Sequence, residues 1–213
     1  MKNFKVKEII GKTTGKRGFT LTELVVTISI VVVIMSVVLF NYSKSEDKLA
    51  LSTATQEVAI AIRQAQVYGT SVRESSAGSR SYNYNYGISF CLSDPSNYYI
   101  YVDSDGNGHY TGSAGGTSCS GTSGESVEKG SLRNGVTISA ICDSITCPAA
   151  SPTGAQWLDI QFTRPNITPK IKIMDANGIV LNSLNSSVGK IIFRSPQGTV
   201  ASTTITTMGQ ISI

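Results

Sequence analysis

The chain has 213 residues, 40% of them hydrophobic and 15% charged, which is enough for one compact domain with a hydrophobic core. The formal net charge is +4, but six of the 18 Lys/Arg and only one acidic residue lie within residues 1–18. The rest of the chain has 12 basic and 13 acidic side chains, a net charge of −1, which excludes a generally basic, nucleic-acid-binding body.

The first predicted element is a long apolar run that follows the basic segment 1–18. Lys16, Arg17 and Gly18 precede 22 residues, 19–40, that contain no Gly or Pro and a single charge, Glu23. As a helix, this run is long enough to span a hydrocarbon core of about 30 Å. A carboxylate in such a span costs roughly 2.5–3.5 kcal/mol at the bilayer centre and less near its edge, so we expect Glu23 to have a function.

The flanking charges predict how this span is oriented. Lys and Arg beside a membrane helix stay in the cytoplasm, which places the C-terminal part of the chain outside. An ordinary secretory signal is excluded because the glycine precedes the apolar run and no small-residue cleavage pattern follows it. An uncleaved signal anchor with an incidental Glu23 is the alternative interpretation.

The helix is predicted to continue beyond the apolar run. Residues 41–68 contain no Gly or Pro, and Gly69 is a natural stop. The sequence therefore predicts one helix over residues 19–68, about 50 residues and roughly 75 Å long. Its second half carries small apolar residues at spacings of three and four, a stripe expected to pack against a sheet. The stripe consists of Ala50, Ala54, Val58, Ala61, Ile62 and Ala65.

The remaining sequence predicts short antiparallel strands and therefore an α+β fold. Residues 157–163 alternate, with Leu158, Ile160 and Phe162 on one side and Asp159, Gln161 and Thr163 on the other. Loops are expected at 70–85, in the Gly/Ser/Thr-rich segment 111–130, and at 144–154. The predicted strands are 86–92, 98–103, 136–141, 157–163, 170–174, 179–184, 188–194, 199–206 and 210–213.

One polar turn is a candidate cation site. Asp103, Asp105 and Asn107 alternate as in a calcium loop, but an EF-hand needs a bidentate Glu where this chain has Ala114. The flanking helices of an EF-hand are also absent from the pattern. A polar hairpin tip with Asn-Gly chemistry is the preferred interpretation, so no metal and no cofactor is expected.

The four cysteines, Cys91, Cys119, Cys142 and Cys147, all lie in the part predicted to be exported, where disulfides are stable. Four residues separate Cys142 from Cys147, which favours a local bridge and leaves Cys91 and Cys119 to close a longer loop, although three pairings are open. Zinc is disfavoured because there is no Cys-x2-Cys pair and the single His109 is not at ligand spacing. No Ser/His/Asp grouping or carboxylate pair in an apolar setting indicates an enzyme.

The sequence Gly18-Phe19-Thr20-Leu21-Thr22-Glu23-Leu24 resembles the cleavage and methylation motif of type IV prepilins and type II secretion pseudopilins. The resemblance implies that prepilin peptidase cuts between Gly18 and Phe19 and that Phe19 is then N-methylated. It implies an assembly role for Glu23, the fifth residue of the processed chain. Thr22 replaces a more usual aliphatic residue. The implied organisation is a leader (1–18), a membrane and assembly helix (19–68) and a β-rich head (69–213).

The C-terminal region resembles a narrower group. Residues 193–198, Phe-Arg-Ser-Pro-Gln-Gly, are similar to the Phe–Pro–Gly turn of H-type pseudopilins and FimT-like minor pilins. Some FimT-like proteins bind DNA through a closing Gly-Arg-x-Arg segment, but residues 209–212 read Gly-Gln-Ile-Ser, without either arginine. Four basic residues could still contact phosphates, although solvated strand faces are the preferred explanation. These residues are Lys170, Lys172, Lys190 and Arg194.

Together these features predict a non-enzymatic minor subunit of a type IV pilus or a type II secretion pseudopilus. It is expected to be a single-pass inner-membrane protein with a cytoplasmic N-terminus and a periplasmic or extracellular head. The expected partners are other pilins, prepilin peptidase, the inner-membrane assembly platform and, before assembly, membrane lipid. A DNA-binding or adhesive tip subunit is the alternative, and a signal-anchored exported enzyme is the least favoured interpretation.

Overall fold

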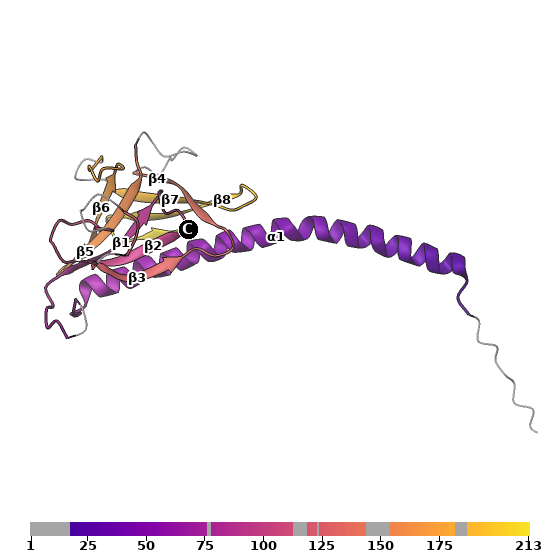
Figure 1. The fold of residues 1–213 in the computed structure, drawn as a ribbon, viewed down its shortest axis with the longest axis horizontal. Helices are drawn as coiled ribbons and strands as arrows, with labels where there is room; N and C mark the ends of the chain where they lie inside the picture. The colour runs from indigo at the N-terminus through magenta and orange to yellow at the C-terminus, as the bar shows by residue number, and fades with distance from the viewer. Residues whose placement is uncertain (1–17, 76–77, 113–118, 123, 144–153, 182–186) are drawn as a thin grey trace, which may run out of the picture. The chain divides into compact units, whose positions relative to one another are not determined.

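The computed structural model describes residues 18–75, 78–112, 119–122, 124–143, 154–181 and 187–213. These residues form one helix, α1 (Leu21–Thr70), followed by strands that are all paired antiparallel (Figure 1). The chain divides into two compact units, residues 1–43 and 44–213, and α1 contributes to both. The predicted α+β class and the single long N-terminal helix are confirmed.

The strands form two sheets. The five-stranded sheet has the order β3-β2-β1-β5-β6, and the four-stranded sheet has the order β4-β7-β8-β9. The strand bounds are β1 (Asn85–Cys91), β2 (Asn97–Asp103), β3 (Ser126–Ser131), β4 (Thr137–Cys142), β5 (Trp157–Thr163), β6 (Asn166–Met174), β7 (Val188–Arg194), β8 (Val200–Thr206) and β9 (Ile211–Ser212). Strands β5 and β7 have the predicted bounds, and β1, β2, β4, β8 and β9 differ from them by one or two residues at their ends.

The end of α1 corrects one expectation. The helix does not stop at Gly69 but continues to Thr70, and Gly69 has no positive φ. A Cβ at this position would lie 2.5 Å from the Phe162 Cβ and 2.9 Å from the Phe162 carbonyl oxygen. Gly69 is therefore a packing residue that lets the helix approach β5 closely, and not a C-cap.

One loop prediction and one strand prediction are wrong. The Gly/Ser/Thr-rich segment expected to be a loop contains β3, an edge strand in which a Cβ at Gly130 would lie 2.0 Å from the Tyr98 ring. The strand expected at 179–184 is reduced to a bridge between Met174 and Val180, and residues 182–186 lie outside the described residues. Residues 175–178, which precede this bridge, form a turn in which Gly178 N donates to the Asp175 carbonyl and Gly178 has φ 77°.

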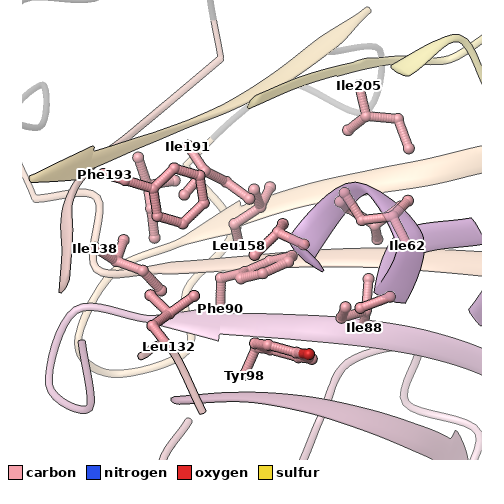
Figure 2. Close-up of a cluster of buried hydrophobic side chains, with 14 of the residues drawn as sticks. Ile62, Ile88, Phe90, Tyr98, Leu132, Ile138, Leu158, Ile191, Phe193 and Ile205 are labelled. Atoms are coloured by element: carbon pink, nitrogen blue, oxygen red, sulfur yellow. The ribbon is translucent and has the colours of Figure 1, made fainter. Parts of the chain in front are cut away.

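The main core lies between residues 44–70 of α1 and one face of each sheet. All six residues of the predicted helical stripe are at most 7% exposed. Figure 2 shows Ile62 of α1 among side chains from both sheets, including Ile88 of β1 and Ile205 of β8. The small side chains of the stripe let the helix lie close to the strands, as the sequence predicts.

The opposite face of the five-stranded sheet is also buried, which the alternation in β5 did not predict. Asp159 and Gln161 were expected on a polar face, yet they are 0% and 3% exposed. The connection from β2 to β3, residues 104–125, brings Tyr110 onto this face, where the ring stacks on Tyr99 with centroids 5.2 Å apart. A second apolar cluster forms there from Cys91, Tyr99, Tyr101, Tyr110, Cys119, Trp157 and Met174.

Candidate functional site

The segment that contains the predicted cleavage point is exposed and non-helical. Residues 18–20 precede the helix, and the Phe19 side chain is 77% exposed. The Gly18–Phe19 bond therefore lies in accessible, non-helical backbone next to the first turn of α1. Residues 1–17 lie outside the described residues.

Thr20 caps the helix, a contact that the sequence analysis missed. Glu23 N donates to Thr20 Oγ1 at 3.2 Å, and Leu24 N donates to the Thr20 carbonyl at 3.1 Å. Thr20-x-x-Glu23 is the pattern of a capping box, and a carboxylate in the first turn also interacts favourably with the helix dipole. Both residues lie after Gly18, so cleavage at Gly18 leaves this cap intact.

The first half of α1 exposes an apolar surface. Between Leu21 and Leu39 every large hydrophobic side chain is more than half exposed, and the most apolar 18-residue window is not buried at all. By length and composition α1 is the one helix among the described residues that could cross a membrane. Such a surface is not stable in water and needs lipid or neighbouring helices to cover it.

Glu23 differs from the other polar side chains of this half. The hydroxyls of Thr27, Ser29 and Ser36 donate to backbone carbonyls three or four residues earlier, at 2.8–2.9 Å. These hydroxyls are hydrogen-bonded inside the helix and need no external acceptor. The Glu23 carboxylate has no hydrogen-bond partner among the described residues, so it is the group in this span that an external partner would satisfy.

The predicted Phe–Pro–Gly turn is fixed to α1. Ser195, 4% exposed, donates from its hydroxyl to the carboxylate of Asp47, which is itself 8% exposed. The same hydroxyl accepts a hydrogen bond from Thr199 N at 3.1 Å, while Gly198 takes φ 87°. The turn thus connects the β7–β8 hairpin to the part of the helix that follows the apolar half.

One of the predicted disulfides is present. Cys91 and Cys119 are bonded, with Cα atoms 5.7 Å apart, and they tie the β2–β3 connection to β1. Cys142 is buried at the end of β4, but Cys147 lies outside the described residues. The Cys142–Cys147 pair stays a prediction.

The four basic candidates for phosphate contact lie on two different sheets. Lys170 and Lys172 are on β6, opposite Gln161 and Asp159, so they face away from the main core on the five-stranded sheet. Lys190 and Arg194 alternate with core residues of β7 in the four-stranded sheet. The strand register therefore divides the candidates into two pairs, each on the outer face of its own sheet.

The turn at 103–108 is not the tip of a tight hairpin, because β3 begins only at Ser126. Asp103 is buried, and Asp105 accepts hydrogen bonds from the backbone and side-chain amides of Asn107 at 3.0 and 2.7 Å. The return of the chain brings Glu125 beside these aspartates, a neighbour that sequence spacing could not reveal.

Asp159 on β5 is a fully buried acid. Burial raises the pKa of Asp159 from its usual value of 3.8 to about 7. Hydrogen bonds from Ser89, Tyr110 N and Trp157 and the charge of Lys172 oppose this rise. The two carboxylate oxygens accept from Tyr110 N at 2.6 Å and from Trp157 Nε1 at 2.8 Å. A buried acid held in this way is a pH-sensitive element of the fold.

Residues 13–39 match the family model of the prokaryotic N-terminal methylation motif. This motif is the signature of type IV prepilins and pseudopilins, and it marks a protein that is structural rather than enzymatic. No curated protein and no solved structure gives a significant match to the chain. The motif and the one apolar N-terminal helix together indicate a membrane-anchored, pilin-type substrate of prepilin peptidase.

Proposed function

We propose that the chain is a minor pilin or pseudopilin of a type IV pilus or a type II secretion pseudopilus. Prepilin peptidase cuts between Gly18 and Phe19, Phe19 is N-methylated, and the processed subunit joins a filament through α1. The observation that carries the proposal is the methylation motif at the start of an apolar helix surface that none of the described residues buries. The Phe–Pro–Gly turn supports a minor subunit of the H-type or FimT-like kind.

The proposed topology places the leader in the cytoplasm and the head outside. Six Lys/Arg in the leader support this orientation, since basic residues beside a span are retained on the cytoplasmic side. The Cys91–Cys119 disulfide supports a head in an oxidising compartment. Before assembly the partners are lipid and the inner-membrane assembly platform, and after assembly they are other pilins.

Glu23 is proposed to fix the register of the subunit in the filament. Cleavage creates an ammonium at Phe19, and the Glu23 carboxylate of a neighbouring subunit would pair with it in a bundle of apolar helices. Pairing offsets the cost of holding either charge in lipid or in a dry filament core. The contact confers specificity because a shifted register leaves both charges unpaired.

The cap at Thr20 makes Glu23→Gln the informative substitution. The observed cap joins Thr20 Oγ1 to the backbone amide of residue 23, and glutamine is also favoured at this helical position, so the variant keeps the helix start and loses only the charge. We expect filament incorporation to fall roughly tenfold or more, the effect of losing about 1.4 kcal/mol of contact free energy. The assay compares the subunit in sheared filaments with the subunit left in the membrane fraction.

The control is Glu46→Gln, which removes an exposed carboxylate from α1 outside the apolar half and should assemble like the wild type. Incorporation of Glu23→Gln at the wild-type level would refute the pairing. The processing step is tested separately by the mass of the protein purified from its host. Gly18→Val should retain the 18-residue leader, whereas Gly124→Val, at a position with open space around it, should lose it normally.

A DNA-binding or adhesive tip subunit is the alternative. The division of the four basic residues between two sheets and the missing Gly-Arg-x-Arg segment favour solvated strand faces over a phosphate-binding surface. A mobility shift that weakens as the salt concentration rises and is lost when Lys170 and Lys172 are neutralised would support the alternative instead.

A further inference from the structure

Three carboxylates from two separate segments meet at the end of the β2 strand. Asp103 is the last residue of β2, Asp105 lies in the following turn, and Glu125 immediately precedes β3. One oxygen of each carboxylate lies within 4.8 Å of the other two. Two oxygens bound to one Ca²⁺ at 2.3–2.6 Å are at most about 5 Å apart, so the spacing fits a shared ion.

Asp103 supplies an independent indication of a ligand. The residue is 2% exposed, and its Oδ2 accepts from Gln161 Nε2 at 2.7 Å and from Gly108 N at 3.2 Å. Its Oδ1 is buried and has no hydrogen-bond partner among the described residues. A buried carboxylate oxygen without a partner is destabilising, and a cation bound to this oxygen would remove the cost.

The other two carboxylates are held in position by the turn itself. Glu125 Oε1 accepts from the Ser104 amide and hydroxyl, each at 3.1 Å, and Oε2 accepts from Thr111 N at 2.9 Å. Asp105 is oriented by its two bonds from Asn107. A carboxylate has about four lone-pair sites, so these bonds orient each group without using up its capacity to bind an ion.

We propose that Asp103, Asp105 and Glu125 bind a divalent cation, Ca²⁺ in the first place. The ligands are hard oxygens without His or Cys, which excludes a typical zinc or copper site. Ca²⁺ accepts irregular sets of six to eight oxygens, so backbone carbonyls and water can complete the shell, whereas Mg²⁺ needs a near-octahedral one. Asn107, the third residue of the sequence pattern, accepts a hydrogen bond from His109 N through its Oδ1 at 2.8 Å, and this bond fixes the turn beside the three carboxylates.

The ion would join the two ends of the β2–β3 connection. This connection starts at Ser104 and ends at Glu125, and it carries Tyr110 and Cys119 onto the outer face of the sheet. Ca²⁺ and the Cys91–Cys119 disulfide thus fix the same segment at different points. Sites of this kind in extracellular modules bind Ca²⁺ with a Kd of about 10⁻⁴–10⁻³ M, which suits the proposed location of the head.

The test uses the full chain in a non-ionic detergent, stripped of metal with a chelator and titrated with CaCl₂ alone. Isothermal calorimetry measures binding, and thermal unfolding measures stability. At a Ca²⁺ concentration ten times Kd we expect the Tm to rise by about 3–6 °C, and Mg²⁺ to give a smaller rise. The site lies in both the precursor and the processed chain, so the result does not depend on filament assembly.

Asp105→Asn is the main variant because Asp105 is exposed and an asparagine can still accept from Asn107 N, which keeps the turn. We expect at least a tenfold loss of Ca²⁺ affinity. The matched control is Asp175→Asn, because Asp175 accepts from Asn177 N at 2.8 Å in a similar turn away from the cluster. No heat and no Tm shift at about 10 mM Ca²⁺, or an unchanged affinity in Asp105→Asn, would overturn the proposal.

Discussion

The buried carboxylate of Asp159 should make the stability of the head depend on pH. Its pKa is about 7 in the folded protein and 3.8 when exposed, because burial disfavours the charged form. The folded state therefore holds a proton more tightly than the unfolded state. The contribution of this bound proton to the free energy of unfolding is fully present below pH 3.8 and is lost as the pH rises to about 7.

The magnitude follows from the size of this shift. Between the two pKa values the free energy of unfolding should fall by about 1.4 kcal/mol for each pH unit, so the fall from pH 5 to pH 8 is about 2.5 kcal/mol. Other titrating groups add their own pH dependence. Comparison with the variant Asp159→Asn isolates the contribution of this residue, since the amide side chain of asparagine does not titrate.

Asp159→Asn also lowers the free energy of unfolding by an amount that does not depend on pH, and this amount does not affect the pH dependence of the difference between wild type and variant. Both Asp159 oxygens accept hydrogen bonds, so an amide places an NH₂ group beside Tyr110 N or Trp157 Nε1 and loses one of the two bonds, at about 1–3 kcal/mol at every pH. The quantity to measure is the difference in unfolding free energy between wild type and variant, obtained by urea denaturation from pH 5 to pH 8. Trp157, the single tryptophan, reports unfolding by fluorescence. A difference that stays constant over this range would refute the reasoning.

Two further substitutions test the contacts of α1 with the strands. Gly69→Ala should lower the free energy of unfolding by about 1–3 kcal/mol, because its Cβ would lie 2.5 Å from the Phe162 Cβ. Gly124→Ala, which has no atom near its Cβ, should lower it by at most about 0.5 kcal/mol. Urea denaturation measures both variants, and equal effects would contradict the packing role of Gly69. Ser195→Ala should lower the free energy of unfolding by about 1–3 kcal/mol in the same assay, because the buried Asp47 carboxylate and Thr199 N both lose the hydroxyl to which they bond. An unchanged free energy of unfolding would show that these bonds do not hold the turn.

Periodicity predicted the inward-facing side of the fold well. The helical stripe around Ala54 and Ile62 and the inner residues of β5 all lie in the core, because apolar spacing directly reports one buried face. Gly69 was misread because a glycine near a helix end has two uses, a left-handed cap and a close contact. Only the position of Phe162, far along the chain, distinguishes them.

The outer side of the five-stranded sheet was not predictable in the same way. Alternation placed Asp159 and Gln161 on the side opposite the apolar residues, but it did not predict that the β2–β3 connection covers this side, since the Gly, Ser and Thr residues of the connection have no apolar period. The available signal was Trp157, a large aromatic residue on the face that Asp159 shares. The acid cluster likewise depends on tertiary structure, since Glu125 reaches Asp103 only when the connection returns.

The processing motif, in contrast, is local, and short spacing was sufficient to find it. Its local character also explains what was missed. Thr20-x-x-Glu23 has the spacing of a capping box, but the prediction for Glu23 concerned only its role in assembly. The structure shows that Thr20 accepts from the amide of Glu23, which leaves the carboxylate itself without a bonded partner among the described residues.

The physics of the apolar half indicates why a single carboxylate would matter in the proposed assembly. Lipid tails are as apolar as the side chains between Leu21 and Leu39, so transfer from membrane to filament changes the hydrophobic free energy little. The hydroxyls in this half bond to their own helix and do not distinguish one register from another. Apolar packing alone would then tolerate sliding of one helix along the next. The charge of Glu23 is the feature of this surface that can select one position, which is why Glu23→Gln should impair assembly and leave the head folded.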